Sequence, residues 1–197
     1  MGVSALLPRE ARRFVSHFRP YTPYGLPTED SYGQEDPWGF LRDLDAAPQR
    51  GIIAGYIQHL APTGRVLDVG CGEGLLLRAL GPDVRYVGVD LSGEAIARAQ
   101  RDFGDRGDFH EADATLFEPD GAFDIIVFNE CLYYMPEPAG VVRRYEAFLA
   151  PEGHAIVSMY EAQLTMRAWS AVGRGRTPKH AVSLIRPDKT RWEIRVY

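Results

Sequence analysis

The chain has 197 residues, 45% of them hydrophobic and 25% charged, which predicts a single domain with a substantial core. Its formal net charge of -5 at pH 7 argues against nucleic acid as a partner, because phosphate binding needs a basic face. The two cysteines and five scattered histidines offer neither a disulfide framework nor a metal-ligand spacing, so we expect no metal and a reducing, cytoplasmic location.

Residues 1–36 form the least regular part of the sequence. The start "MGVSALLPREARR" lacks the apolar run of a secretory signal, and no stretch of the chain is apolar for long enough to span a membrane. Residues 19–37 carry four prolines, two glycines and three tyrosines, and prolines and glycines interrupt both helix and sheet. The segment is either a loose terminus or a lid whose aromatic rings cover a site. We expect an irregular lid over residues 1–36, followed by one domain over residues 37–197.

Two helices are expected before the first strand, over residues 37–46 and 48–61. Each opens with a proline, which suits the first turn of a helix. In the second helix, apolar residues at helical spacing form one face, which consists of Ile52, Ile53, Tyr56, Ile57 and Leu60.

Beyond residue 64, apolar strands and helices alternate along the chain. We expect strands over residues 65–69, 84–90, 107–113, 123–129 and 153–160, and helices over residues 73–80, 92–103 and 138–150. Single helices between strands imply right-handed crossovers and a parallel sheet. Residues 180–186 and 191–197 alternate in polarity on either side of "PDKT", which predicts a hairpin at the end of the chain.

The stretch "RVLDVGCGEG" (65–74) is a strand followed by a glycine-rich turn, which is typical of nucleotide-binding sites. A dinucleotide fold would place a third glycine where this chain has Leu75, and a P-loop would add a Lys-Ser or Lys-Thr pair. The carboxylates of Asp68 and Glu73 would repel a pyrophosphate placed close to them. They favour a ligand that carries an ammonium or sulfonium charge.

Acidic residues also end the next two predicted strands. Asp90 follows the turn at a distance that suits binding to both hydroxyls of a ribose. Asp113 is available to accept a hydrogen bond from the exocyclic amine of adenine. An adenosine with a free ribose and a cationic group in place of phosphates describes S-adenosylmethionine.

Five successive motifs resemble those of the class I S-adenosylmethionine-dependent methyltransferases, in the same order. They are "VLDVGCGEG", "VGVDLS", "EADATLF", "FDIIVFNECLYYM" and "LAPEGHAIVSMY". The resemblance covers about residues 48–160. It implies a Rossmann-like α/β fold with a seven-stranded, mostly parallel sheet flanked by helices, in the strand order 3-2-1-4-5-7-6 with strand 7 antiparallel.

The resemblance also implies which residues would bind the cofactor. Those expected at the methionine moiety are Asp68, Gly70 and Asn129. Those expected at the ribose and the adenine are Gly72, Asp90, Leu91, Asp113 and Ala114. A narrower resemblance, carried by "DPWGF", "PQR" and "NECLYYM", is to the nodulation-type N-methyltransferases that act on an amino sugar. It implies that Trp38 and Arg50 help enclose the cofactor.

Methyl transfer is an in-line displacement in which the protein supplies alignment and excludes water. Glu130 is the candidate base for the acceptor's proton, with Tyr134 as its positioning partner. The aromatic faces of Trp38, Tyr133 and Tyr134 suit a methylsulfonium cation. Each assignment has a structural alternative: Trp38 in the core, a tyrosine packed beneath the helix at 138–150, and Glu130 as a solvated helix cap.

Two other features remain open in the sequence. Cys71 and Cys131 follow neighbouring strands and so approach one cleft, although small buried residues are the better interpretation. The basic stretch "GRGRTPKH" (173–180) is either a solvated loop or, if it lies over the cleft, a surface for an acidic acceptor.

The sequence thus predicts an enzyme that methylates an N or O nucleophile of a small molecule, such as an amino sugar or a natural-product intermediate. We expect a monomer or homodimer, with neither nucleic acid nor membrane as a partner. The alternatives are another reaction on the same fold, such as aminopropyl transfer, and a non-catalytic S-adenosylmethionine-binding subunit. A nicotinamide-dependent dehydrogenase is a more distant alternative.

Overall fold

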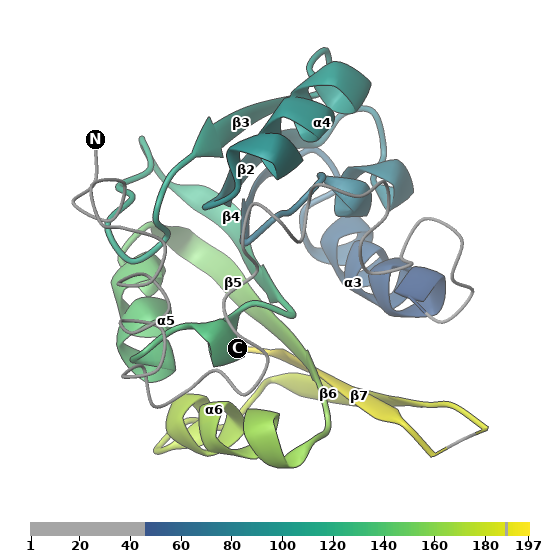
Figure 1. Cartoon of the computed structure of the whole chain (residues 1–197), viewed down its shortest axis with the longest axis vertical. Coiled ribbons are helices and arrows are strands. Elements are labelled where there is room, and N and C mark those ends of the chain that lie inside the picture. The colour runs from purple at the N-terminus through teal and green to yellow at the C-terminus, as the bar shows by residue number, and fades with distance from the viewer. Residues whose placement is uncertain (1–45, 188) are drawn as a thin grey trace, which may run out of the picture.

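A computed structural model describes residues 46–187 and 189–197 (Figure 1). The expected helix over residues 37–46, the lid over residues 1–36 and Trp38 lie outside the described residues, apart from Ala46.

The described chain is built around one seven-stranded sheet with the order β3-β2-β1-β4-β5-β7-β6 (Figure 1). Its strands are β1 (Arg65–Val69), β2 (Arg85–Asp90), β3 (Gly107–Glu111), β4 (Phe123–Asn129), β5 (Leu149–Tyr160), β6 (His180–Ile185) and β7 (Arg191–Val196). Strands β1 to β5 pair in parallel, and β7 is antiparallel to both β5 and β6. The predicted fold class, the strand order and the terminal hairpin are confirmed.

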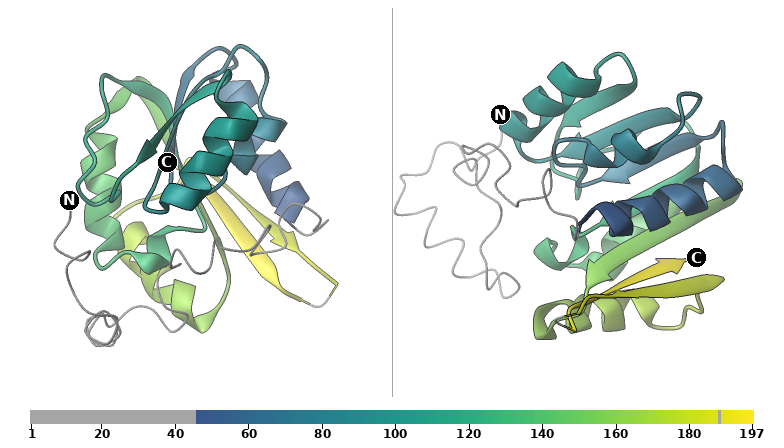
Figure 2. Two further views of the ribbon diagram at one scale, coloured as in Figure 1. Left: turned by 45° about the horizontal axis from the view of Figure 1, so that its top comes forward. Right: turned by 90° about the vertical axis from the view of Figure 1, so that its right-hand side faces the viewer.

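Helices cover both faces of this sheet, and each face has its own core. On one face lie α3 (Ala46–Leu60), the 3₁₀ helix η2 (Leu75–Ala79) and α4 (Gly93–Phe103). On the other lie the 3₁₀ helix η3 (Leu132–Tyr134), α5 (Pro138–Glu146) and α6 (Gln163–Gly173). Figure 2 shows these layers from two further directions. No helix in the described ranges is both long and apolar enough to cross a membrane.

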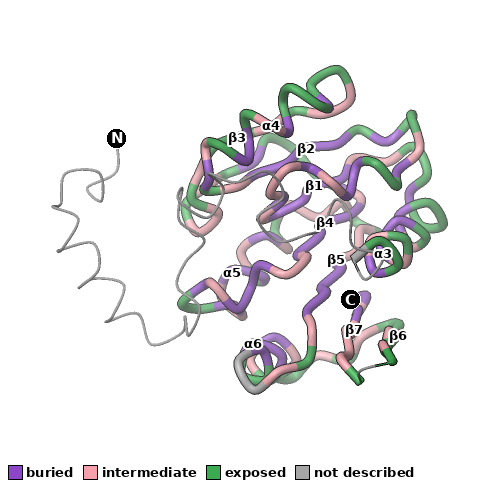
Figure 3. The backbone as a smooth tube through the Cα atoms, turned by 45° about the vertical axis from the view of Figure 1, so that its right-hand side comes forward, coloured by how far each residue is buried: buried purple, intermediate pink, exposed green. Residues whose placement is uncertain are grey.

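The central strands are buried on both sides, which explains their continuous apolar sequences. In β1, Val66 belongs to the core on the α3 side of the sheet, here called the α3 core. Leu67 and Val69 belong to the core on the α5 side, here called the α5 core. All three residues are fully buried. β4 alternates between the two cores in the same way. Figure 3 shows buried backbone running through β1, β4 and β5. This pattern is typical of a parallel sheet sandwiched between helices.

Four elements differ from the prediction, one of which is β5, because it begins at Leu149 rather than at residue 153. Residues 75–79 form a 3₁₀ helix instead of the expected helix over 73–80, because Gly74 before them is left-handed and Leu80 after them is already extended. The expected strand over residues 107–113 ends at Glu111. The helix expected to reach residue 150 ends at Glu146, because Leu149 already pairs with Phe123 as part of β5.

The helix α6 was not predicted. Its start is held by Thr165, whose hydroxyl donates to the carbonyl of Tyr160 at 2.6 Å and accepts from the amide of Ala162 at 3.0 Å. Its buried apolar residues, Ala168, Trp169 and Val172, recur at helical spacing and pack in the same core as α5.

Candidate functional site

The predicted site residues meet along one edge of the sheet, where the parallel strands end. Val69 of β1 pairs with Val89 of β2 on one side and with Phe128 of β4 on the other. In β5, Ser158 pairs with Asn129, the last residue of β4. The carboxyl ends of four adjacent strands therefore lie side by side (Figure 1), which is where open α/β sheets bind ligands.

The glycine turn after β1 has a left-handed backbone at its three glycines, and Gly70 and Gly74 have no room for a side chain. Gly70, Gly72 and Gly74 all have positive φ, at 74°, 54° and 71°. A Cβ on Gly70 would approach the Cβ of Cys131 to 2.5 Å, which no real side chain tolerates. Only glycine combines this backbone conformation with such close contact. The packing of Cys131 against the turn therefore requires glycine at position 70.

Asp90, at the end of β2, holds this turn in place through a hydrogen bond to its backbone. Its Oδ2 accepts from the amide of Gly72 at 2.8 Å, and its Oδ1 accepts from the amide of Ser92 at 2.9 Å. Burial raises its pKa, while these amide donors oppose the shift. A carboxylate oxygen has lone pairs for more than one donor, so Asp90 can still accept from ligand hydroxyls.

Asp68 lies within β1 and is 2% exposed. Its Oδ2 accepts a hydrogen bond from the Tyr86 hydroxyl at 2.6 Å, whereas its Oδ1 is buried without a partner in the described part of the chain. Burial raises the pKa of Asp68 to about 7, against the lowering effect of Tyr86. An unpartnered buried carboxylate oxygen is costly, and a cationic group of a ligand would relieve that cost.

Glu73 does not contribute the free negative charge that the sequence suggested. Its Oε1 lies 2.6 Å from Nη1 of Arg98 on α4, and both side chains are largely buried. Because this ion pair neutralises Glu73 within the fold, the charges left to attract a cation at the turn are those of Asp68 and Asp90.

The residues expected at the adenine lie beyond the ends of β2 and β3. Leu91 is 56% exposed, which is unusual for a leucine next to a buried strand and leaves it free to contact a flat ring. Asp113 stabilises the loop after β3, because its Oδ1 accepts hydrogen bonds from the amide and the hydroxyl of Thr115. The carbonyl of Ala114 accepts from Arg144 and Tyr145 of α5, so this loop is anchored to the opposite face.

A polar cluster, here called the Gln49 cluster, lies where β4 and β5 end; its Asn129 and Glu130 are half-buried and its other members are buried. It consists of Gln49, Asn129, Glu130, Tyr133 and Ser158. Nε2 of Gln49 lies 2.9 Å from Oδ1 of Asn129, 2.9 Å from Oε1 of Glu130 and 2.7 Å from Oγ of Ser158. Sequence analysis missed Gln49 and Ser158. For Ser158 the available signal was a polar residue inside the apolar run "AIVSMY", whereas Gln49, between Pro48 and Arg50, carried no such signal.

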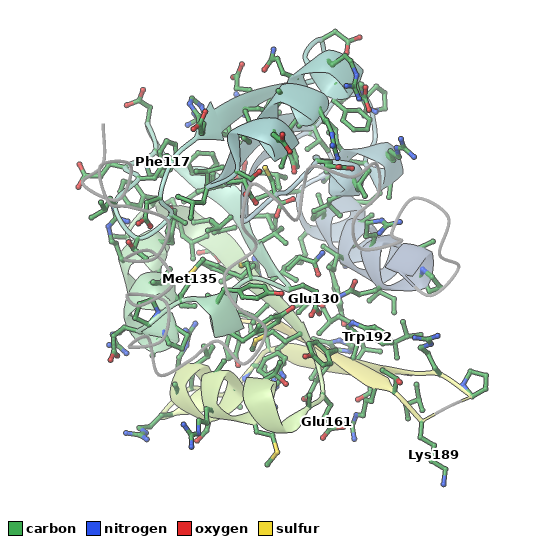
Figure 4. All side chains as sticks on the ribbon, in the orientation of Figure 1. Phe117, Glu130, Met135, Glu161, Lys189 and Trp192 are labelled. Atoms are coloured by element: carbon green, nitrogen blue, oxygen red, sulfur yellow. The ribbon has the colours of Figure 1, made fainter. Side chains whose placement is uncertain are left out.

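Glu130 is the chemically distinctive member of this cluster (Figure 4). Its φ of 56° is a left-handed conformation that costs energy for any residue with a side chain. Its Oε2 accepts from the Tyr133 hydroxyl at 3.1 Å. Burial raises the pKa of Glu130 to about 8, although donors from Tyr160, Tyr133 and Gln49 oppose the shift. These contacts do not fit the alternative of a solvated helix cap.

The two tyrosines of η3 differ in environment. Tyr133 is 6% exposed and belongs to the α5 core, so the structural alternative is right for its ring, while its hydroxyl reaches Glu130. Tyr134 is half-buried, with its ring centre 4.4 Å from that of Tyr133. Tyr160 packs edge-on against Tyr133 at 5.6 Å. Aromatic rings therefore adjoin the Glu130 carboxyl group.

Comparison with known proteins identifies the family. A sequence profile described as a methyltransferase domain matches residues 40–193, more than half of the chain. The chain belongs to this methyltransferase domain family.

Individual relatives of this methyltransferase domain are more distant. The ubiquinone biosynthesis O-methyltransferase of Ralstonia nicotianae is 36% identical over 113 residues, which cover 52% of this chain and 47% of that protein. The trans-aconitate 2-methyltransferase of Streptomyces avermitilis is 28% identical over 171 residues, covering 82% of this chain and 59% of that protein. The chain spans about half the length of the curated relatives it matches.

Among solved structures, the N-methyltransferase NodS of Bradyrhizobium japonicum in complex with S-adenosyl-l-homocysteine superposes with a TM-score of 0.69. The superposition covers 85% of this chain and 94% of NodS at 20% sequence identity. At that identity the likeness shows a shared fold.

Two residues implied by the narrower resemblance remain predictions as cofactor contacts. Arg50 lies in α3 directly after Gln49 and is half-buried. Trp38 lies outside the described residues.

The basic stretch over residues 173–180 lies away from the site of this methyltransferase domain. Nζ of Lys179 is 3.3 Å from Nε2 of His154, which pairs with Ile125 toward the amino-terminal side of the parallel strands. Arg176 forms an ion pair with Glu146 and stacks over the ring of Tyr197. The alternative of a basic surface over the cleft is therefore wrong.

The two cysteines are buried next to the glycine turn. The thiol of Cys131 donates to the carbonyl of Val69 at 3.0 Å, and Cys71 lies under Gly88. Burial raises the pKa of both thiols well above its usual value, so they are poor nucleophiles. The interpretation as small buried residues is confirmed.

Proposed function

We propose that the protein is an S-adenosylmethionine-dependent methyltransferase that acts on an N or O nucleophile of a small molecule. The observation that carries this proposal is the buried, unpartnered Oδ1 of Asp68 next to the glycine turn, in a chain of the methyltransferase domain family. A nucleotide with a pyrophosphate would bring negative charge to a carboxylate, whereas S-adenosylmethionine brings an ammonium and a sulfonium.

The residues of the sheet edge fit this cofactor in three parts. Asp68 and Gly70 would receive the methionine ammonium end, and Asp90 with the Gly72 backbone would receive the ribose. The amide oxygen of Asn129 accepts from Gln49, so the Asn129 NH₂ group faces away from Gln49 and is available to the methionine carboxylate. Leu91, Asp113 and Ala114 would line the adenine.

The bound cofactor would supply a methyl group on a sulfonium, and the chain's own residues would manage the acceptor. An acceptor hydroxyl or ammonium must lose its proton for the nitrogen or oxygen to attack. Glu130 is the proposed proton acceptor, because its pKa of about 8 lies near the working pH. Tyr133 donates to Glu130 and holds the carboxyl group, and Tyr134 is the proposed positioning residue for the acceptor.

Two further parts of the proposal concern the whole chain. Residues 1–36 would cover the acceptor as a lid, in a cytoplasmic monomer or homodimer. Deleting them should reduce turnover more than it weakens binding of S-adenosylhomocysteine, the reaction product. Full activity of the truncated protein would contradict the lid.

The cofactor is tested by calorimetric titration with S-adenosylhomocysteine and, separately, with NAD. We expect binding of S-adenosylhomocysteine and none of NAD. The absence of S-adenosylhomocysteine binding would overturn the proposal.

The reaction is tested by incubating the protein with S-adenosylmethionine and a panel of small amines, phenols and carboxylic acids. A product heavier than its acceptor by one methylene shows methyl transfer. A gain of an aminopropyl group, or a rearranged product with the mass of the acceptor, would instead identify another reaction on the same fold.

A further inference from the structure

The side-chain amide of Gln49 joins three elements at the candidate site. It extends from the first described turn of α3 and is 4% exposed. Its Nε2 reaches Asn129 at the end of β4, Glu130 in the following turn and Ser158 in β5, all within 2.9 Å. Ser158 is fully buried, so this contact lies inside the fold rather than on its surface.

The donor capacity of this amide is smaller than the number of its acceptors. A glutamine NH₂ group carries two hydrogens, and three oxygens share them. When Glu130 is ionised, its Oε1 attracts these hydrogens most strongly, because hydrogen bonds to a charged group are about twice as strong as neutral ones. The sharing therefore depends on the protonation state of Glu130.

The surroundings of Glu130 contain neutral donors rather than a cation. From η3 it receives the Tyr133 hydroxyl, from β5 the backbone amide of Tyr160, and from α3 the Gln49 amide. The nearby titratable thiol of Cys131 is itself protonated. Within the described residues, no ion pair links Glu130 to an arginine, lysine or histidine, so these three donors are what favours its carboxylate form.

The backbone conformation of Glu130 gives its neighbours a second role, because they must also hold this residue in place. Glu130 holds a left-handed φ of 56°, and its amide donates to the carbonyl of Ser158 at 2.9 Å. A strained residue persists only when its neighbours hold it in place. Gln49 contacts both the Glu130 side chain and the residue that anchors its backbone.

We propose that Gln49 is a positioning residue that orients the Glu130 carboxyl group and favours its ionised form, so that Glu130 can take the acceptor's proton. This role rests on the proposed methyl transfer. It assigns to α3 a direct part in preparing the proton acceptor, although the glutamine itself need not touch either substrate.

The test measures the titration of Glu130 directly and therefore needs no acceptor. Protein labelled with ¹³C at the glutamate carboxyl carbon is titrated by NMR from pH 4 to 10, and the Glu130 signal is assigned by its loss in Glu130→Gln. Gln49→Met removes the donor and keeps the volume. Losing one hydrogen bond to a charged group should raise the pKa of Glu130 by about one to two units.

The direction of this shift separates positioning from simple support of the fold. If the substitution merely loosened the site, water would enter and the pKa of Glu130 would fall toward its ordinary value. An unchanged or lowered pKa in Gln49→Met would overturn the proposal. Gln58→Met, the same substitution at an exposed position of α3, is the matched control and should leave the titration unchanged.

A second variant keeps the test decisive if Gln49→Met does not fold. Gln49→Glu is nearly isosteric and places a second carboxyl group beside that of Glu130. The two groups would share a proton, which would raise the apparent pKa of the pair. A pKa for Glu130 that stays at the wild-type value in this variant would also overturn the proposal. Failure of the proposed function would appear separately, as absent binding of S-adenosylhomocysteine by the wild-type protein.

Discussion

At the scale of single residues, two of the carboxyl groups with raised pKa are Asp68, in β1, and Glu130, directly after the neighbouring strand β4. Burial is the first cause of both shifts. Their partners differ, because Asp68 keeps one oxygen unpartnered in the described chain while Glu130 is surrounded by donors. Asp68 is therefore suited to bind a cation, and Glu130 to accept a proton.

The state of Asp68 should make cofactor binding depend on pH. Its pKa of about 7 means that the ionised form, which binds the ligand ammonium, rises from a small to a large fraction between pH 6 and 8. We expect the affinity for S-adenosylhomocysteine to increase about tenfold over this range, measured by calorimetry. Asp68→Asn should bind weakly with little pH dependence, whereas Asp108→Asn, on the exposed side of β3, should behave like wild type. A flat wild-type profile would contradict the assignment.

The glycine turn offers a second test at this scale. Gly70→Ala should lower the free energy of unfolding by about 2–4 kcal/mol, because it adds a Cβ in a left-handed conformation against Cys131. Gly51→Ala, at an exposed site in α3 with open space around it, should instead raise it by about 0.5–1 kcal/mol. Urea denaturation measures both. Equal stability of the two variants would refute the tight turn.

At the scale of elements, α5 forms hydrogen bonds with the loop after β3, which is distant from it in the sequence. Arg144 donates to the carbonyls of Ala114 and Phe117, and the Tyr145 hydroxyl donates to Ala114 at 2.8 Å. The loop after β3 has no helix of its own, so these donors satisfy its backbone. The expected adenine edge is thus held by a helix from the opposite face of the sheet.

This anchoring predicts an effect at a distance. Arg144→Met should lower the free energy of unfolding by about 1–2 kcal/mol, since two carbonyls lose a charged donor. It should also weaken S-adenosylhomocysteine binding several-fold by loosening Ala114. Arg143→Met changes the exposed neighbour and should leave both quantities unaltered, as measured by denaturation and calorimetry. Unchanged binding in Arg144→Met would show that the loop does not contact the ligand.

At the scale of the whole molecule, the sheet separates two cores and gathers its polar groups at one edge. Figure 4 shows Glu130 near the centre of the view, and Lys189 at the far tip of the β6–β7 hairpin. The strands end together because they are parallel, so residues distant in sequence share this edge. Burying carboxyl groups at this edge costs free energy, which the other interactions of the fold offset.

Global stability should therefore fall as the pH rises. The pKa values of Asp68 and Glu130 are raised to about 7 and about 8 in the folded state, so the folded protein binds more protons than the unfolded chain between pH 5 and 8. Their stabilising contribution is complete in acid and is lost as the pH passes these values. We expect the ligand-free protein to lose at least about 2 kcal/mol over this range.

The matched variant is the double substitution Asp68→Asn with Glu130→Gln, which should reduce the dependence of the unfolding free energy on pH, with Asp90 as the remaining carboxyl group of raised pKa at this site. Saturating S-adenosylhomocysteine should also reduce it, because the ligand ammonium stabilises ionised Asp68. A double variant as pH-dependent as wild type would assign the effect to other groups.

The sequence by itself determined the succession of strands along the chain, the terminal hairpin and the type of turn after β1. These follow from local patterns: apolar runs, glycines at Gly70, Gly72 and Gly74, and acids at the strand ends. Local patterns were insufficient for η2 and α6. The first is bounded by a left-handed Gly74 and an extended Leu80. The second depends on the hydrogen bonds of Thr165 and on packing in the α5 core.

Only the tertiary structure decided which polar groups meet. It paired Glu73 with Arg98, which removed a charge that the sequence had assigned to the ligand. It also brought Gln49 to Asn129, Glu130 and Ser158, across separations of 80 to 109 residues. Spacing along the chain carries no information on such contacts, because the register of parallel strands and the packing of α3 against them set which side chains lie within hydrogen-bonding distance.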